Sequence, residues 1–201
     1  MSTRARSIRH SLLIQTEDVR QIFDNVAFIV FNYDRCLEYF LTNALQMTYG
    51  IRAEEAESIV ANLKIIHTYG LIRQVSFGFD KADYFHAADD IKTYTEQIAA
   101  VDVIEQLRAE VERADAIVFL GFAFHSQNLL MLKPSKPTKP KFVYGTAYKM
   151  SGADVEVVSE QLATFFQPVI NSEARARIKL ENNLTSAGLF DHYAKSLTGG
   201  D

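Results

Sequence analysis

Four short apolar runs constrain the fold of this chain more than any other feature. Their lengths and their content of β-branched and aromatic residues are typical of parallel strands that are buried on both faces. The runs cover residues 26–31, 63–66, 116–120 and 142–144. Because each is far shorter than the roughly 20 residues of a membrane-spanning helix, we expect strands rather than membrane segments.

Segments with helical periodicity lie between and after these runs. Apolar residues recur at intervals of three and four, as in Leu37, Leu41 and Leu45, which marks the buried side of an amphipathic helix. The expected helices cover residues 35–48, 53–62, 88–113, 153–166 and 172–182. Strands that alternate with helices predict a three-layer α/β fold whose sheet is mostly parallel.

This pattern also predicts the domain organisation. We expect an N-terminal helix over residues 1–24, with Val19, Ile22 and Phe23 on its inner side, and an α/β core over residues 25–150. Residues 151–201 are expected to add the last helices and a polar tail.

Composition excludes several classes of protein. A hydrophobic content of 48% is sufficient for a globular core, and a formal charge of −4 gives no reason to expect a nucleic-acid partner. Cys36 is the only cysteine, so no intrachain disulfide can form and a reducing compartment is the simpler assumption. Without a secretory-signal pattern at the N-terminus, we expect a soluble cytoplasmic protein that does not bind membranes.

Polar and small residues follow each apolar run. Asn32 and Asp34 follow the first run and His67 ends the second, whereas Gly121 and Gly145 begin the segments after the third and fourth. Ligands of open parallel sheets bind outside the carboxyl ends of the strands. We therefore expect these residues to converge along one sheet edge.

Each of these residues also has a structural interpretation. Asn32 or Asp34 can cap the following helix, His67 can be a hydrogen-bonded core histidine, and Gly121 can serve a tight turn. Cys36 lies in the first helical turn, where the helix dipole lowers a thiol pKa, although a packed and inert thiol is the alternative. The histidines lack partners at metal-ligand spacing, so we expect no metal site; they include His10, His86, His125 and His192.

Taken in order, the motifs at the strand ends resemble those of the SIR2-like family, the sirtuin-related domains of bacterial NAD hydrolases. Residues 31–38, Phe-Asn-Tyr-Asp-Arg-Cys-Leu-Glu, are similar to its (T/F)NYDxxLE element. Residues 67–70 are similar to its His-x-(Tyr/His)-Gly element. Residues 114–122 and 124–128 resemble its strand with a glycine turn and its Phe-His-x-x-Asn segment.

The resemblance implies a Rossmann-like fold and hydrolysis of NAD, which is the substrate, at the nicotinamide–ribose bond, in antiphage defence. Asn32 would hold the water or a ribose oxygen, and His67 would act as general base. Asp34 would contact the nicotinamide end or fix its loop. Protein deacylation is less expected, because the zinc module of deacylases needs four cysteines.

The resemblance also implies a binding surface for the rest of the nucleotide, NAD or a similar ADP-ribose compound. Gly121 and Thr146 would lie against the adenosine half, and Phe122, Asn128 and Gly145 would complete the binding residues.

One family element has no counterpart in this chain. The family domain begins with a strand and a glycine-rich loop that cradles the pyrophosphate, but no glycine precedes Gly50. Losing two or three charge-assisted hydrogen bonds would weaken nucleotide binding by at least about a hundredfold. The missing strand would also leave an open sheet edge, so we expect a homo-oligomer or a partner protein.

Three functional hypotheses follow. The first is an NAD hydrolase whose phosphate loop is supplied by another segment or by a partner. The second is a degenerate SIR2-like module that senses a nucleotide or binds a protein without catalysis. The third is an α/β scaffold in which the polar residues at the strand ends serve only as caps and turns.

Overall fold

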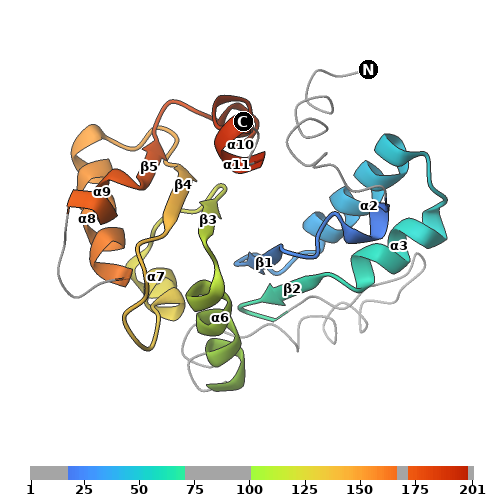
Figure 1. Ribbon diagram of the computed structural model, residues 1–201, viewed down its shortest axis with the longest axis horizontal. Coiled ribbons are helices and arrows are strands. Elements are labelled where there is room, and N and C mark those ends of the chain that lie inside the picture. The colour runs from blue at the N-terminus through green and yellow to red at the C-terminus, as the bar shows by residue number, and fades with distance from the viewer. Residues whose placement is uncertain (1–17, 71–100, 167–171, 199–201) are drawn as a thin grey trace, which may run out of the picture. The chain divides into compact units, whose positions relative to one another are not determined.

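The computed structural model describes residues 18–70, 101–166 and 172–198. Helices alternate with strands that pair in parallel, so the predicted α/β class is confirmed (Figure 1). These residues divide into two compact units, and the boundary lies between Glu105 and Gln106. We call them the N-terminal unit, which contains residues 18–70, and the C-terminal unit, which contains residues 106–198.

The described strands form two sheets where the sequence predicted one. The N-terminal unit has a two-stranded sheet, β1–β2, and the C-terminal unit has a three-stranded sheet, β3–β4–β5.

The N-terminal unit contains the first two predicted strands and the first two predicted interior helices. Each element lies within two residues of its expected limits. They are β1 (Ala27–Val30), α2 (Cys36–Tyr49), α3 (Ala53–Ala61) and β2 (Lys64–His67). Helix α2 ends where Gly50 adopts a left-handed conformation, with φ of 67°, and its N–H donates to the carbonyl of Gln46, which is a common C-terminal helix cap.

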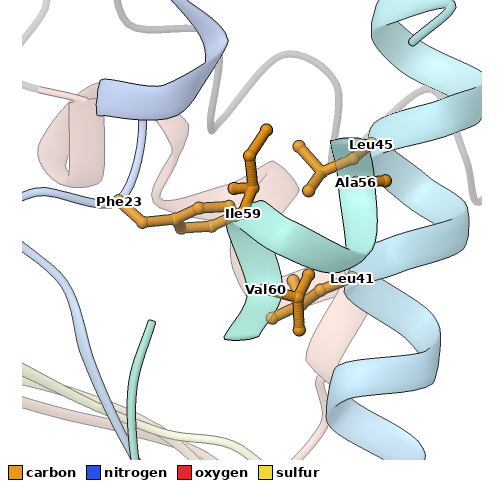
Figure 2. Close-up of a cluster of buried hydrophobic side chains, with 6 residues drawn as sticks. All are labelled: Phe23, Leu41, Leu45, Ala56, Ile59 and Val60. Atoms are coloured by element: carbon orange, nitrogen blue, oxygen red, sulfur yellow. The ribbon is translucent and has the colours of Figure 1, made fainter. Parts of the chain in front are cut away.

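The core of this unit lies between α2 and α3. Figure 2 shows Leu41 and Leu45 of α2 among side chains of α3, with the ring of Phe23 beside Ile59. Leu41 and Leu45 lie about one helical turn apart on α2, so they present one continuous apolar side to α3. Phe28 of β1 and Leu37 of α2 pack against the same cluster. The packing therefore fixes how α2 lies against the β1–β2 sheet.

The N-terminal helix predicted for residues 1–24 lies mostly outside the described residues. Its described end is the short 3-10 helix η1 (Val19–Gln21), followed by a turn rather than by continuous α-helix. Asp18 starts η1, because its backbone is extended and its side chain accepts the N–H of Arg20. The predicted inner side is confirmed for Phe23, which is buried, and for Val19 and Ile22, which pack against the core.

The C-terminal unit places β4 in the centre of its sheet. Val143 to Thr146 are all buried, as expected for a strand with a neighbour on each side. The elements are α6 (Val101–Arg113, whose first residues lie before the boundary), β3 (Ala116–Phe119), α7 (Ser126–Leu132), β4 (Phe142–Thr146), α8 (Gly152–Phe166), α9 (Ser172–Ala176), β5 (Ile178–Glu181), α10 (Ser186–His192) and α11 (Ala194–Thr198). None of the helices in the described ranges has the length and apolar character needed to cross a bilayer.

The helix predicted for residues 172–182 is wrong in its second half. Helix α9 ends at Ala176, and β5 follows and pairs with β4. Ile178 and Leu180 alternate with Lys179 and Glu181, which is the two-residue period of a strand. The predicted polar tail likewise contains α10 and α11, and Leu189 of α10 is fully buried.

Gly145 lies where the three strands of the C-terminal sheet leave no room for a side chain. In the register of the sheet it pairs with Phe119 of β3 on one side and with Leu180 of β5 on the other. A Cβ atom at Gly145 would lie 2.7 Å from Leu180 Cδ2 and 3.2 Å from Phe119 Cβ. Both distances are shorter than a normal contact, so close packing gives a structural reason for a glycine at this position.

Replacing Gly145 with alanine is expected to destabilise the C-terminal unit by about 1–3 kcal/mol, because Leu180 and Phe119 must move. Gly152→Ala is the matched control, since nothing lies within 4 Å of its added Cβ and alanine favours a helix by about 0.5–1 kcal/mol. Urea unfolding followed by circular dichroism measures both variants. A Gly145→Ala protein as stable as wild type would contradict the packing explanation.

Candidate functional site

His67 and Glu38 form a half-buried pair in the N-terminal unit. His67 ends β2 and is level with Val30 at the end of β1, whereas Glu38 lies in the first turn of α2. His67 Nε2 lies 3.2 Å from Glu38 Oε1, and the side chains are only 11% and 18% exposed. This histidine is hydrogen-bonded, as its structural interpretation requires, but the bond uses only one of its two ring nitrogens.

The other polar atom of each side chain in the pair has no hydrogen-bond partner in the part of the chain that the structure describes. His67 Nδ1 and Glu38 Oε2 are both buried and accept or donate no hydrogen bond to the described residues. Buried polar atoms are nearly always satisfied in folded proteins, so unsatisfied ones need an explanation. At the carboxyl end of a parallel strand, contact with a ligand or substrate is such an explanation.

Asp34 acts at the start of α2. Its Oδ1 accepts the backbone N–H of Cys36, the first residue of α2, at 2.9 Å. The N-cap position itself is Arg35, which makes no side-chain cap bond, so Asp34 supports the start of α2 from the residue before the cap. The backbone N–H of Cys36, then its side chain, and to a smaller extent His67 lower the pKa of Asp34 below its ordinary value. Asp34 is therefore a fixed negative charge near His67 at neutral pH.

Cys36 differs from both expectations. Its side chain is exposed, so the prediction of a packed thiol is wrong. Its pKa is raised, chiefly by the hydrogen bond with Asp34 and the charge of that carboxylate, and further by Glu38. The expectation of a lowered pKa is wrong too, because two nearby carboxylates outweigh the helix dipole.

Asn32 lies in the exposed loop that joins β1 to α2, and aromatic residues hold this loop. The ring of Tyr69 contacts the rings of Phe31 and Tyr33, with centroids 6.1 and 6.0 Å apart. Thr68 is fully buried, and both its N–H and its hydroxyl donate to the carbonyl of Val30, at 2.9 and 3.2 Å. The segments that follow β1 and β2 are thus joined to each other directly on either side of Asn32.

The predicted nucleotide-binding residues lie in the C-terminal unit and have internal contacts. Gly121 follows β3 with a φ of 62°, and its N–H donates to the buried hydroxyl of Thr146 at 3.0 Å. The ring of Phe122 packs against Phe119 and Phe124, with centroids 5.1 and 5.2 Å apart. Gly145 has the packing role described above, and Asn128 is half-buried in α7.

The structure therefore assigns the predicted site residues to two groups. Asn32, Asp34 and His67 belong to the N-terminal unit, where the β1–β2 pairing brings the ends of their strands together. The five residues expected to bind the nucleotide belong to the C-terminal unit. Convergence of the two groups on one ligand stays a prediction.

Sequence reasoning missed two acidic residues. Glu38 was part of a recognised motif but had no assigned role, and its place in the first turn of the helix that follows Asp34 was the available signal. Glu181 ends β5 and accepts a short hydrogen bond from the hydroxyl of Tyr193, whose pKa is raised by burial and then by that bond. Because β5 was predicted as helix, no pattern placed Glu181 at a strand end.

Among residues 18–70, 101–166 and 172–198, no three histidine, cysteine or acidic side chains gather in a way that would hold a metal ion. His10 and His86, considered above, lie outside these ranges.

Comparisons of the chain with protein-family models, with curated proteins and with solved structures give no match. The likeness to SIR2-like domains therefore rests on the strand-end motifs, and function has to be inferred from the geometry of the residues themselves.

Asp34→Ala is expected to lower the free energy of unfolding at pH 7 by about 0.5–2 kcal/mol, because α2 loses the acceptor for the Cys36 N–H. Asparagine also caps helices, so Asp34→Asn is the matched control and should lose less. The lowered pKa means that the ionised form stabilises the fold above the ordinary value of 3.8. This contribution should disappear as the pH falls through the lowered pKa.

Urea titrations at pH 7 and at acid pH measure the difference between wild type and Asp34→Ala. An unchanged stability at pH 7, or an equally large difference in acid, would show that Asp34 does not support α2 through its charge.

Proposed function

We propose that the chain hydrolyses the nicotinamide–ribose bond of NAD, with His67 as the general base. The observation that carries this proposal is a half-buried imidazole at the end of β2, paired in register with the end of β1, from which Asn32 and Asp34 follow. Imidazole is suited to proton transfer near neutral pH. The motif resemblance supports NAD as the substrate and antiphage defence as the setting.

The proposed reaction consumes one water molecule. The bond between ribose C1′ and nicotinamide N1 breaks, and its electron pair leaves with N1, which turns the pyridinium into neutral nicotinamide. The oxygen of water bonds to C1′ and one proton of that water passes to His67, so the products are nicotinamide, ADP-ribose and a proton. The transition state resembles an oxocarbenium ion, as in glycoside hydrolysis.

The residues around His67 fit a reaction in which positive charge develops on the sugar. Asp34 carries a negative charge at neutral pH because its pKa is lowered, and such a charge favours a cationic transition state. Asn32 is exposed and offers an amide to the water or to a ribose oxygen. Neither role requires a strong nucleophile, and the pKa of the nearby Cys36 is raised.

We propose that a second copy or another polypeptide completes the protein. In the described sheets β1 and β3 are edge strands, and β1 is apolar although none of its four residues is buried. An apolar edge strand favours pairing with a further strand. Such a partner is also the simplest source of the glycine-rich loop that the chain lacks.

A second candidate function is a non-catalytic module that senses a nucleotide or binds a protein. Two internal bonds favour it, since Gly121 donates its N–H to Thr146 and Asp34 accepts from Cys36. Groups engaged in this way are less available to a ligand.

Purified full-length chain incubated with NAD is expected to release nicotinamide, measured by chromatography. His67→Ala should lower the rate about 10²- to 10⁴-fold, the usual contribution of a general base. His192→Ala is the matched control, because that histidine is exposed on α10, and it should keep the wild-type rate. No release by wild type, or equal release by His67→Ala, rejects the hydrolase.

Calorimetry with NAD and with ADP-ribose separates the two candidates. Binding without nicotinamide release is expected of the sensing module, whereas binding with release is expected of the hydrolase. If neither compound binds, the third hypothesis, an α/β scaffold without a nucleotide, is favoured.

A further inference from the structure

We propose that Glu38 is the positioning residue of His67: it holds Nε2 and leaves Nδ1 as the nitrogen that accepts the proton. The inference rests on the proposed function in which His67 is the general base. Glu38 itself is not assigned any contact with substrate.

The backbones that carry Glu38 and His67 are each held in place by contacts of their own. On one side, the Asp34–Cys36 bond starts α2, and Leu37 and Leu41, which flank Glu38, hold the helix against the core. On the other side, the β1–β2 register fixes His67 beside Val30. The 3.2 Å distance between Nε2 and Oε1 therefore joins two side chains whose backbones are independently held.

The chemistry of the two groups determines where the imidazole proton lies. A neutral imidazole has one N–H donor and one acceptor nitrogen, whereas an ionised carboxylate only accepts. Facing Glu38, Nε2 must therefore carry the hydrogen, and Nδ1 becomes the acceptor. A carboxylate that fixes the tautomer and ring orientation of a catalytic histidine is an established arrangement.

The hydrogen bonding of the second ring nitrogen points the same way. Nδ1 is buried and has no hydrogen-bond partner among the described residues. In the same residues, Glu38 forms no ion pair except the one with His67. If His67 served only to link β2 to α2, its role would not explain why Nδ1 lacks a hydrogen-bond partner among these residues.

The first test reads the tautomer directly and does not depend on catalysis. In ¹⁵N-labelled full-length protein at a pH where His67 is neutral, nuclear magnetic resonance should show Nε2 protonated and Nδ1 unprotonated. The Nε2 proton should resonate far downfield because it is bonded to a carboxylate, and His67→Ala should remove this signal and so assign it. In Glu38→Leu the downfield proton should be lost and both tautomers should be populated.

A wild-type spectrum with the proton on Nδ1, or a tautomer unaffected by Glu38→Leu, overturns the proposal.

The second test reads the effect on the reaction. Glu38→Gln keeps the shape but removes the charge, and it should lower kcat for nicotinamide release about 10- to 100-fold, the usual effect of a residue that orients another, with little change in KM. Glu38→Asp should recover part of the rate. Glu57→Gln is the matched control, because Glu57 is exposed on α3, and its kcat should equal that of wild type.

The outcomes separate this inference from the function on which it rests. A normal kcat in Glu38→Gln, with only a lower melting temperature, means that the pair is merely structural and rejects the positioning role. If wild type releases no nicotinamide, the hydrolase proposal fails and with it the catalytic role of Glu38. The spectrum then still decides whether Glu38 sets the tautomer of His67.

Discussion

The parallel pairing of β1 with β2 is the constraint on which the candidate site depends. It sets His67 level with Val30, and the N–H and hydroxyl of Thr68 fix the same carbonyl of Val30 immediately afterwards. A shift of one residue would turn His67 to the opposite face of the sheet and separate it from Glu38. The apolar contacts between α2 and α3 matter for the same reason, since they hold the helix that carries Glu38.

The sequence predicted the fold well where one kind of pattern dominated. Continuous apolar runs gave four strands, and helical periodicity gave α2, α3 and α8 within two residues of their limits. The prediction failed at residues 178–181, because a strand of two apolar and two charged residues directly after a short helix also fits a helical pattern. It also gave a single sheet where the described strands form two, because strand pairing is a long-range property that local patterns do not contain.

The part of the candidate site in the N-terminal unit was predicted in position but not in its contacts. The rule that ligands bind at the carboxyl ends of parallel strands correctly brought the segments with Asn32, Asp34 and His67 together. The role of Glu38 was not predicted, because its contact depends on how α2 is rotated against the sheet. Gly145 was expected to contact a ligand, which stays a prediction, and the tight packing of neighbouring side chains against it was not foreseen, because it depends on distances between strands.

The two carboxylates beside α2 have a consequence for the redox behaviour of the chain. Cys36 is its only cysteine and is exposed, and Asp34 and, to a smaller extent, Glu38 raise its thiol pKa and so reduce the thiolate fraction further. Since thiolates, not thiols, attack electrophiles and disulfides, oxidants and alkylating agents should react with it slowly. The residues that begin the helix and hold the imidazole thus also protect the neighbouring sulfur from chemical damage.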